Sequence, residues 1–186
     1  MNVVATMPHM MQAAAVRRIR AEEGPRWRAL RLRALADAPI AFMDTVEQAS
    51  LRPDSAWHDA AVAHSTGCRS ALFIAERAGV WVGVAGGFID DDGDTTIFTV
   101  FVDPEARGQQ VLESLLDAVA AWSLSCGRET LRLEVAVQNP RALAAYRRLG
   151  FTETGRSRAH PLYPEVTEVE MTRPASHPPA WGHRVS

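Results

Sequence analysis

Residues 102–112, Val-Asp-Pro-Glu-Ala-Arg-Gly-Gln-Gln-Val-Leu, have the residue types to hold a phosphate group. The preceding segment, Thr95 to Val102, is rich in β-branched and aromatic residues and predicts a strand that ends before Pro104. The following segment has apolar residues at spacings of three and four, which predicts an amphipathic helix. Unpaired amides at a helix start attract anions, and Arg107 adds a positive charge beside them. A pyrophosphate would fit this site; an ordinary turn with a solvated arginine is the alternative.

A carboxylate and a phenol follow in the next predicted strand and helix. Leu131 to Val137 alternates apolar and polar residues, which predicts a strand packed on one side with Glu134 on its polar face. Asn139 is a good N-cap for a helix from Pro140 to Leu149, which contains Tyr146. A phenol of pKa about 10 stays protonated at neutral pH and can donate a proton, whereas a carboxylate can accept one.

In order and spacing, these pieces resemble the GNAT superfamily of N-acetyltransferases. The resemblance rests on Val102-x-Pro104-x-x-Arg107-Gly108, then Leu133-Glu134-Val135, then Asn139-x-x-Ala142-x-x-x-Tyr146-x-x-x-Gly150-Phe151. It implies an α/β (α+β) fold, with a mixed, mostly antiparallel sheet of about six or seven strands flanked by helices. It also implies an acetyl-CoA-dependent N-acetyltransferase, in which a primary amine attacks the thioester directly where two central parallel strands splay apart.

The resemblance assigns a cofactor site and an acid. Pantetheine would bond strand backbone, and the pyrophosphate would lie on the amides of the helix start. The residues expected to bind acetyl-CoA are Phe101, Val102, Arg107, Gly108, Gln109, Gln110, Val111, Leu112 and Asn139. Tyr146 matches the position of the acid that protonates the leaving thiolate, with a core tyrosine as the alternative.

Glu134 is the leading candidate for the base that deprotonates the amine. Its spacing of twelve residues before Tyr146 resembles that in ribosomal-protein alanine N-acetyltransferases, where these positions serve as base and acid. A purely structural strand glutamate is an equal alternative, and an ordered water or the aspartates of the predicted 90–94 hairpin would then accept the proton. The acceptor is either a small-molecule amine or a protein N-terminus.

The sequence departs from the family pattern in the phosphate loop. Gln110 and Leu112 stand where the family usually has small residues. Glycine there permits close approach to the pyrophosphate, so a side chain narrows the site while its amides remain. The alternative function is therefore a non-catalytic CoA-binding or sensory module with a degenerate phosphate loop.

Composition agrees with one domain and excludes several other classes. A chain of 186 residues with 47% hydrophobic residues can bury a full core. A net charge of −2 disfavours nucleic-acid binding, and no metal site is expected. Cys68 and Cys126 lack metal-binding or redox spacing and predict reduced thiols in a cytoplasmic protein. No membrane-length span or signal peptide is expected, and a homodimer is compatible with the sequence.

The expected organisation is a flexible segment at 1–15, an acetyltransferase domain at 16–173 and a flexible tail at 174–186. The first predicted helix and the loop from Asp37 to Glu47 should form one wall of the acceptor cleft. Ahead of the phosphate motif, the expected elements are strands at Val16–Arg20, Ala71–Glu76 and Val80–Ile89, helices at Pro25–Ala36 and Asp54–Ala63, and a hairpin turn at Asp90–Asp94.

Overall fold

The structure is a computed structural model that describes residues 13–176. Its strands in these residues are β1 (Ala15–Arg18), β2 (Ser70–Arg77), β3 (Val80–Ile89), β4 (Thr95–Val102), β5 (Thr130–Ala136), β6 (Thr152–Ala159) and β7 (Thr167–Pro174). Its α-helices are α1 (Gly24–Asp37), α2 (Val46–Ser50), α3 (Asp54–Ser65), α4 (Val111–Ser125) and α5 (Pro140–Arg148). Short 3-10 helices occupy Ala21–Glu23, Pro39–Ala41 and Pro104–Ala106.

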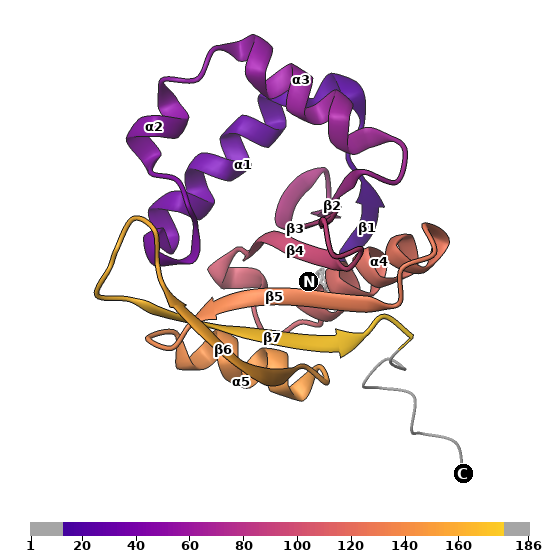
Figure 1. The fold of residues 1–186 in the computed structure, drawn as a ribbon. Helices are drawn as coiled ribbons and strands as arrows, with labels where there is room; N and C mark the ends of the chain where they lie inside the picture. Colours follow the sequence, from indigo (N-terminus) through magenta and orange to yellow (C-terminus); the bar gives the residue numbers. More distant parts are fainter. Residues whose placement is uncertain (1–12, 177–186) are drawn as a thin grey trace, which may run out of the picture.

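The described strands form one sheet of seven in the order β1-β2-β3-β4-β5-β7-β6. Only the central pair β4–β5 is parallel, and every other neighbouring pair is antiparallel. Figure 1 shows α1, α2 and α3 on one side of the sheet and α5 on the other. One core cluster joins α1 and α3 to the sheet, and a second joins α4 and α5 to its opposite face. The predicted fold class is confirmed.

The predicted elements agree with the observed ones to within about two residues, as expected for helix and strand ends. β4 and β3 have the predicted bounds, and α5 starts at Pro140 with Asn139 as its N-cap, whose side chain accepts a hydrogen bond from the Ala142 amide at 3.1 Å. β1 begins at Ala15 and β7 ends at Pro174, just outside the expected domain limits. Most of the two expected flexible ends, 1–12 and 177–186, lies outside the described residues.

Glycines in β3 let large groups approach both faces of the sheet. A Cβ on Gly83 would meet Leu115 of α4 at 3.1 Å, and one on Gly87 would meet Trp122 of the same helix at 3.0 Å. On the other face, a Cβ on Gly86 would lie only 2.5 Å from the ring of Phe98. These positions therefore exclude side chains, because helix and ring already occupy the space that a side chain would need.

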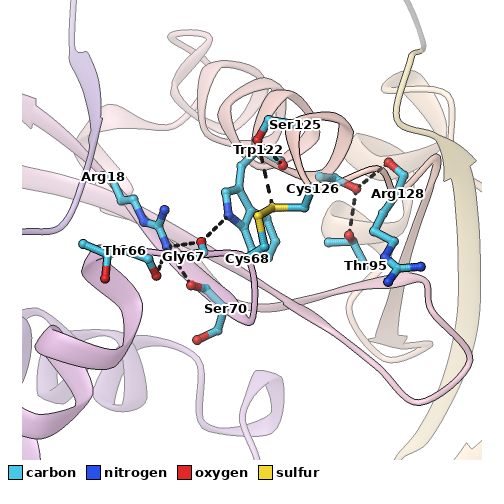
Figure 2. The surroundings of a disulfide bond; sticks show 11 residues. Arg18, Thr66, Gly67, Cys68, Ser70, Thr95, Trp122, Ser125, Cys126 and Arg128 are labelled. Atoms are coloured by element: carbon cyan, nitrogen blue, oxygen red, sulfur yellow. Dashed lines mark hydrogen bonds between the residues drawn. A yellow bond between two sulfur atoms is a disulfide. The ribbon is translucent and has the colours of Figure 1, made fainter.

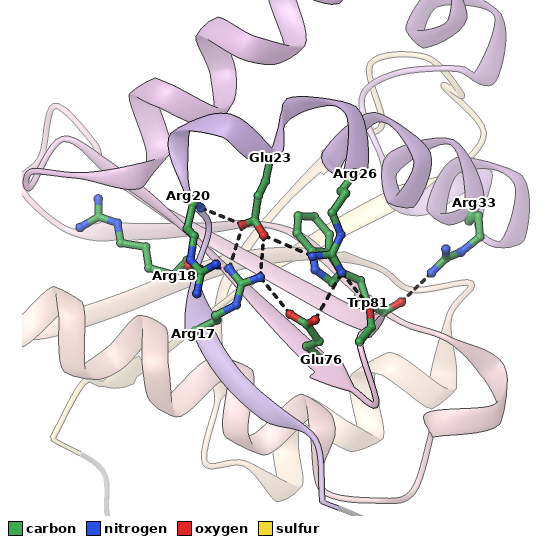
Figure 3. A network of polar contacts seen from close by, with 9 residues as sticks. Arg17, Arg18, Arg20, Glu23, Arg26, Arg33, Glu76 and Trp81 are labelled. Atoms are coloured by element: carbon green, nitrogen blue, oxygen red, sulfur yellow. Dashed lines mark hydrogen bonds and ion pairs between the residues drawn. The ribbon is translucent and has the colours of Figure 1, made fainter.

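A network of charged side chains fixes the start of α1 to the sheet (Figure 3). The buried carboxylate of Glu23 pairs with Arg17 of β1 at 2.6 Å and with Arg26 of α1 at 3.3 Å. Arg17 also pairs with Glu76 of β2 at 2.9 Å, and the guanidinium of Arg26 lies 4.5 Å from the Trp81 ring centre. The Arg17 guanidinium holds the pKa of the Glu23 carboxyl below its ordinary value, so the network stays ionised at neutral pH.

Cys68 and Cys126 form a disulfide, so the prediction of reduced thiols is wrong (Figure 2). Their Cα atoms lie 5.5 Å apart, within the range that a disulfide spans. The Trp122 indole donates to the Gly67 carbonyl at 3.1 Å, and Arg18 donates to the same carbonyl at 3.0 Å. Cysteine spacing did not reveal this pair because the loop after α3 and the end of α4 meet only in the folded chain.

No helix within residues 13–176 combines the length and the apolar composition that crossing a bilayer requires.

Candidate active site

The two central strands part after a short paired stretch. β4 and β5 are paired only at Thr95–Leu131 and Thr96–Arg132, although both strands continue for several residues. The register between β3 and β4 shifts where Thr99 has a φ of 52°, which is a bulge that bends β4. The sheet is therefore open between the second half of β4 and the second half of β5.

Arg31 of α1 supports this bulge from the side of α1 and α3. It is 9% exposed, and its Nη1 donates to the Thr99 hydroxyl at 3.0 Å. Its guanidinium lies 4.6 Å from the Phe42 ring centre and 3.8 Å from the buried Asp44 carboxylate. Burial lowers the pKa of Arg31 to about 10, so this cation remains charged at neutral pH.

A cavity of about 1190 Å³ occupies the opening between the strands. It is bounded by β4, β5, α5, the start of α4 and the segment that follows α1. The lining includes residues from both core clusters, so the cavity reaches both faces of the sheet. Asp37, Ala38, Ile40, Ala41, Phe42 and Met43 line it, so the segment after α1 forms one wall of this cavity; its role as a wall of an acceptor cleft stays a prediction. Ligand sites in open α/β sheets commonly lie at such strand ends.

The start of α4 opens into this cavity. Val111 and Leu112, the first residues of the helix, line the cavity, and their amides have no acceptor within the helix. Gln110 precedes them with φ 61° and ψ 8°, a left-handed conformation that costs a non-glycine residue about 1–2 kcal/mol. Gly108 also has a positive φ, of 76°, and nothing lies within 4 Å of where its Cβ would be.

Arg107 makes contacts that sequence reasoning did not foresee. Its Nη2 pairs with Asp37 at the end of α1, and its Nε donates to the Val102 carbonyl at 2.9 Å. The Asp103 amide bonds to the Val82 carbonyl of β3, so Val102 presents its own amide and carbonyl toward the open side of β4. Arg107 therefore joins α1 to the strand end, and its role as a phosphate ligand stays a prediction.

Tyr146 lies on the inner face of α5 and lines the cavity. Its side chain is 8% exposed, and its ring packs edge-on against Phe151 with centres 5.7 Å apart. Burial raises the pKa of the Tyr146 phenol above its ordinary value of 10.0. The hydroxyl is therefore protonated at all physiological pH values and is a proton donor.

Glu134 lies on the opposite face of β5 from Leu133 and Val135, which pack with α4 and α5. Its carboxylate accepts a hydrogen bond from Arg158 of β6, and Arg158 also pairs with the buried Glu168 of β7 at 3.2 Å. Burial raises the pKa of the Glu134 carboxyl; Arg158 opposes this shift, and the charge of Glu168 adds to it. A carboxylate with a raised pKa is a better base near neutral pH.

The cavity brings most of the predicted site residues together. Those that line it are Phe101, Val102, Arg107, Gly108, Gln110, Val111, Leu112, Glu134, Asn139 and Tyr146. Gln109 does not line it, because its side-chain amide turns back to the Glu105 carbonyl at 2.8 Å. The hairpin aspartates do not line it either, since Asp94 and Asp92 pair with Arg132 at 2.6 and 3.2 Å.

Sequence reasoning missed Glu168 and Arg158, which the structure places beside Glu134. They lie on the last two strands, where no motif marked them. The alternation of β7 was the available signal, because Val169 and Met171 pack into the core and Glu168 faces the other side with the polar residues.

The sequence profile of the Acetyltransferase (GNAT) family matches residues 32–151. The chain belongs to this family. Mycothiol acetyltransferase of Thermobispora bispora is 34% identical to it over 132 residues. That alignment covers 68% of this chain but only 42% of the relative, so the chain spans less than half of that protein.

Solved structures of the GNAT family share the fold. An acetyltransferase of the GNAT family from Streptococcus pneumoniae superposes with a TM-score of 0.74, at 14% identity over 87% of this chain and 98% of its own. Spermidine N-acetyltransferase from Vibrio cholerae, in complex with CoA and spermine, gives a TM-score of 0.70 at 16% identity over 88% of this chain and 96% of its own. At these identities the likeness concerns the fold alone.

Proposed function

We propose that this protein is an acetyl-CoA-dependent N-acetyltransferase that acts on a primary amine in a ternary complex. The observation that carries the proposal is the cavity between β4 and β5, which joins the start of α4, Tyr146 and Glu134. Family membership supports the activity, and the solved spermidine N-acetyltransferase with CoA supports the cofactor.

The residues present fit acetyl-CoA. The open side of β4 offers the backbone of Val102 to the amides of pantetheine, in the manner of an added strand. The first amides of α4 suit the pyrophosphate, because they carry the positive end of the helix dipole. Arg141 and Arg148 of α5 also line the cavity, where Arg148 pairs with Glu113 of α4 at 2.8 Å.

Two side chains would transfer protons during acetyl transfer, one as a base and one as an acid. Acetyl-CoA supplies the acetyl group as a thioester. Glu134 accepts a proton from the ammonium form of the acceptor, because only the free amine can attack the carbonyl carbon. Tyr146 donates its proton to the sulfur as the carbon–sulfur bond breaks, and it regains a proton from the nitrogen, which loses its second proton on becoming an amide. Burial keeps the phenol protonated before and after the step, because it disfavours the phenolate.

Acetyl-CoA should stabilise the folded protein. A ligand that binds only the native state raises the free energy of unfolding by about 2.7 kcal/mol at a hundredfold excess over Kd. Thermal denaturation with increasing acetyl-CoA measures the effect. An unchanged melting temperature at millimolar acetyl-CoA, with no heat of binding in calorimetry, would contradict the cofactor site.

Replacing Glu134 by glutamine should remove the base. In the wild type, kcat/KM should fall as the pH drops through the pKa of Glu134, and this fall is the acidic limb of the pH profile. The pKa lies above the ordinary glutamate value of about 4.3, because burial raises it. Glu134→Gln should lower kcat/KM and abolish this acidic limb. Glu170→Gln is the matched control: it removes a nearby negative charge, which should keep the limb and move it to lower pH. An acidic limb retained in Glu134→Gln would transfer the role to Glu168 or water.

Gln110→Gly should tighten acetyl-CoA binding without loss of stability. The sequence alone predicts a small loss of stability, because glycine near a helix start is unfavourable. The left-handed φ of Gln110 changes this expectation, because glycine adopts that conformation without strain. Strain relief of about 1–2 kcal/mol offsets the extra chain entropy of glycine, about 0.5–1 kcal/mol. Calorimetric Kd and the denaturant midpoint separate the two effects.

Gln109→Gly is the control for this substitution, because Gln109 has no positive φ and does not line the cavity. It should leave the Kd unchanged and lower the stability. Weaker acetyl-CoA binding by Gln110→Gly would instead mean that the glutamine side chain contacts a phosphate oxygen.

A CoA-binding module without catalysis is the second candidate. Gln110 and Leu112 at the phosphate loop favour it, as does the pairing of Arg107 with Asp37, which neutralises the arginine. Tight CoA binding without turnover of any amine would support this second function.

A further inference from the structure

The part of the cavity on the α1 and α3 side contains a fixed aromatic wall. The Phe98 ring lies against the backbone of Gly86, 5.9 Å from the Phe88 ring centre and 5.5 Å from that of His64. Both phenylalanines line the cavity. Because contacts on several sides hold the Phe98 ring, it is positioned before any ligand arrives, which reduces the entropy lost on binding.

Another wall of the cavity comes from the segment after α1. Phe42 is buried under the guanidinium of Arg31, and Met43 is 53% exposed with its sulfur 3.8 Å from Arg158. An exposed methionine at a cavity wall can adapt to the shape of an apolar ligand. Together, Phe42, Met43, Phe88 and Phe98 form what we call the apolar chamber.

Charge is distributed unevenly around the apolar chamber. Beside it, Glu134 and Glu168 share a single cation, Arg158, so this group has one net negative charge and attracts an ammonium. Behind Phe42, the Arg31 cation shares Asp44 with Arg52, which leaves one net positive charge. A ligand with one ammonium beside an apolar group matches this distribution of charge, with the ammonium at the negative group. A second ammonium near Arg31 would be repelled.

We propose that the acceptor is a primary monoamine carrying one aromatic, ring-sized group, with its ammonium at Glu134 and its ring between Phe98 and Met43. The proposal rests on the proposed acetyl transfer and names the class of its acceptor. A polyamine is disfavoured, because Phe42, Met43, Phe88 and Phe98 offer its further ammonium groups no carboxylate. Besides Glu134 and Glu168, the carboxylates of the described residues that line the cavity are Asp37 and Glu113, and these are already paired with Arg107 and Arg148.

Comparison of amines tests the acceptor class directly. With acetyl-CoA in excess, kcat/KM for 2-phenylethylamine should exceed that for n-propylamine and for putrescine by about tenfold or more, as expected for a ring buried in an apolar site. Equal or faster acetylation of putrescine or spermidine, or acetylation of N-terminal peptides alone, would overturn the proposal.

Two substitutions test the walls. Phe98→Ala should lower kcat/KM for 2-phenylethylamine about tenfold more than it lowers kcat/KM for n-propylamine. Met43→Ala should act in the same direction, and its exposed position spares the fold. Leu51→Ala is the control, because Leu51 is 79% exposed and does not line the cavity. Equal effects of Phe98→Ala and Met43→Ala on both amines would contradict a ring site.

Binding separates this proposal from the proposed function. Calorimetry of 2-phenylethylamine with the CoA-loaded protein should show binding that Met43→Ala weakens. Binding without any turnover would overturn the proposed catalysis and support the chamber. Turnover of amines with no preference for a ring would overturn the chamber alone.

Discussion

Tyr146→Phe should lower kcat by about 10²- to 10⁴-fold, the usual scale for a positioned acid. The substitution removes only the hydroxyl and keeps the ring that packs on Phe151. The Kd for acetyl-CoA should therefore change little, so the loss is confined to the chemical step. Steady-state kinetics with calorimetric cofactor binding measures both quantities.

The chain offers a matched control in its only other tyrosine, Tyr163. Its ring packs on His160 and does not line the cavity. Tyr163→Phe should retain wild-type kcat. If Tyr146→Phe also retains it under conditions where chemistry limits the rate, Tyr146 is a packing residue and the sulfur takes its proton from water.

Reduction of the Cys68–Cys126 disulfide should lower the free energy of unfolding by about 4 kcal/mol. The bond closes a loop with a sequence separation of 58, and loops of this length lose about that much on opening in the chain-entropy description. Urea denaturation with and without dithiothreitol measures the difference.

The variant Cys68→Ser with Cys126→Ser is the control for reduction. It should show the lower stability under both conditions and no response to dithiothreitol. Two titratable thiols in the unreduced, urea-unfolded protein would contradict the bond and restore the sequence-based prediction of reduced thiols.

Local patterns in the sequence were sufficient for much of the fold. The strand before Pro104 and the helix after Asn139 carry their own start and stop signals, and the structure has both. The opening of the sheet was implied only by family resemblance, since it depends on the bulge at Thr99 and its contact with Arg31. Contacts between residues 68 positions apart leave no mark on local periodicity.

The residues that line the cavity were predictable where a motif contained them. Tyr146 and Glu134 stand at motif positions, and both line the cavity. The partners of Glu134 were not predictable, because Arg158 and Glu168 reach it only through pairing of β5 with β7 and of β7 with β6. The left-handed Gln110 was also missed, since glutamine rarely adopts that conformation and the sequence signals only the absent glycine.

Product analysis after incubation with acetyl-CoA and a panel of amines, which includes 2-phenylethylamine, putrescine and N-terminal peptides, is the most direct test of acetyl transfer by this protein. We expect free CoA thiol and an equal amount of N-acetylated amine, identified by mass spectrometry. The chain contains no lysine, so self-acetylation at side-chain amines cannot mask the result. Saturable acetyl-CoA binding with neither thiol nor N-acetylated amine above the protein-free background would contradict the account.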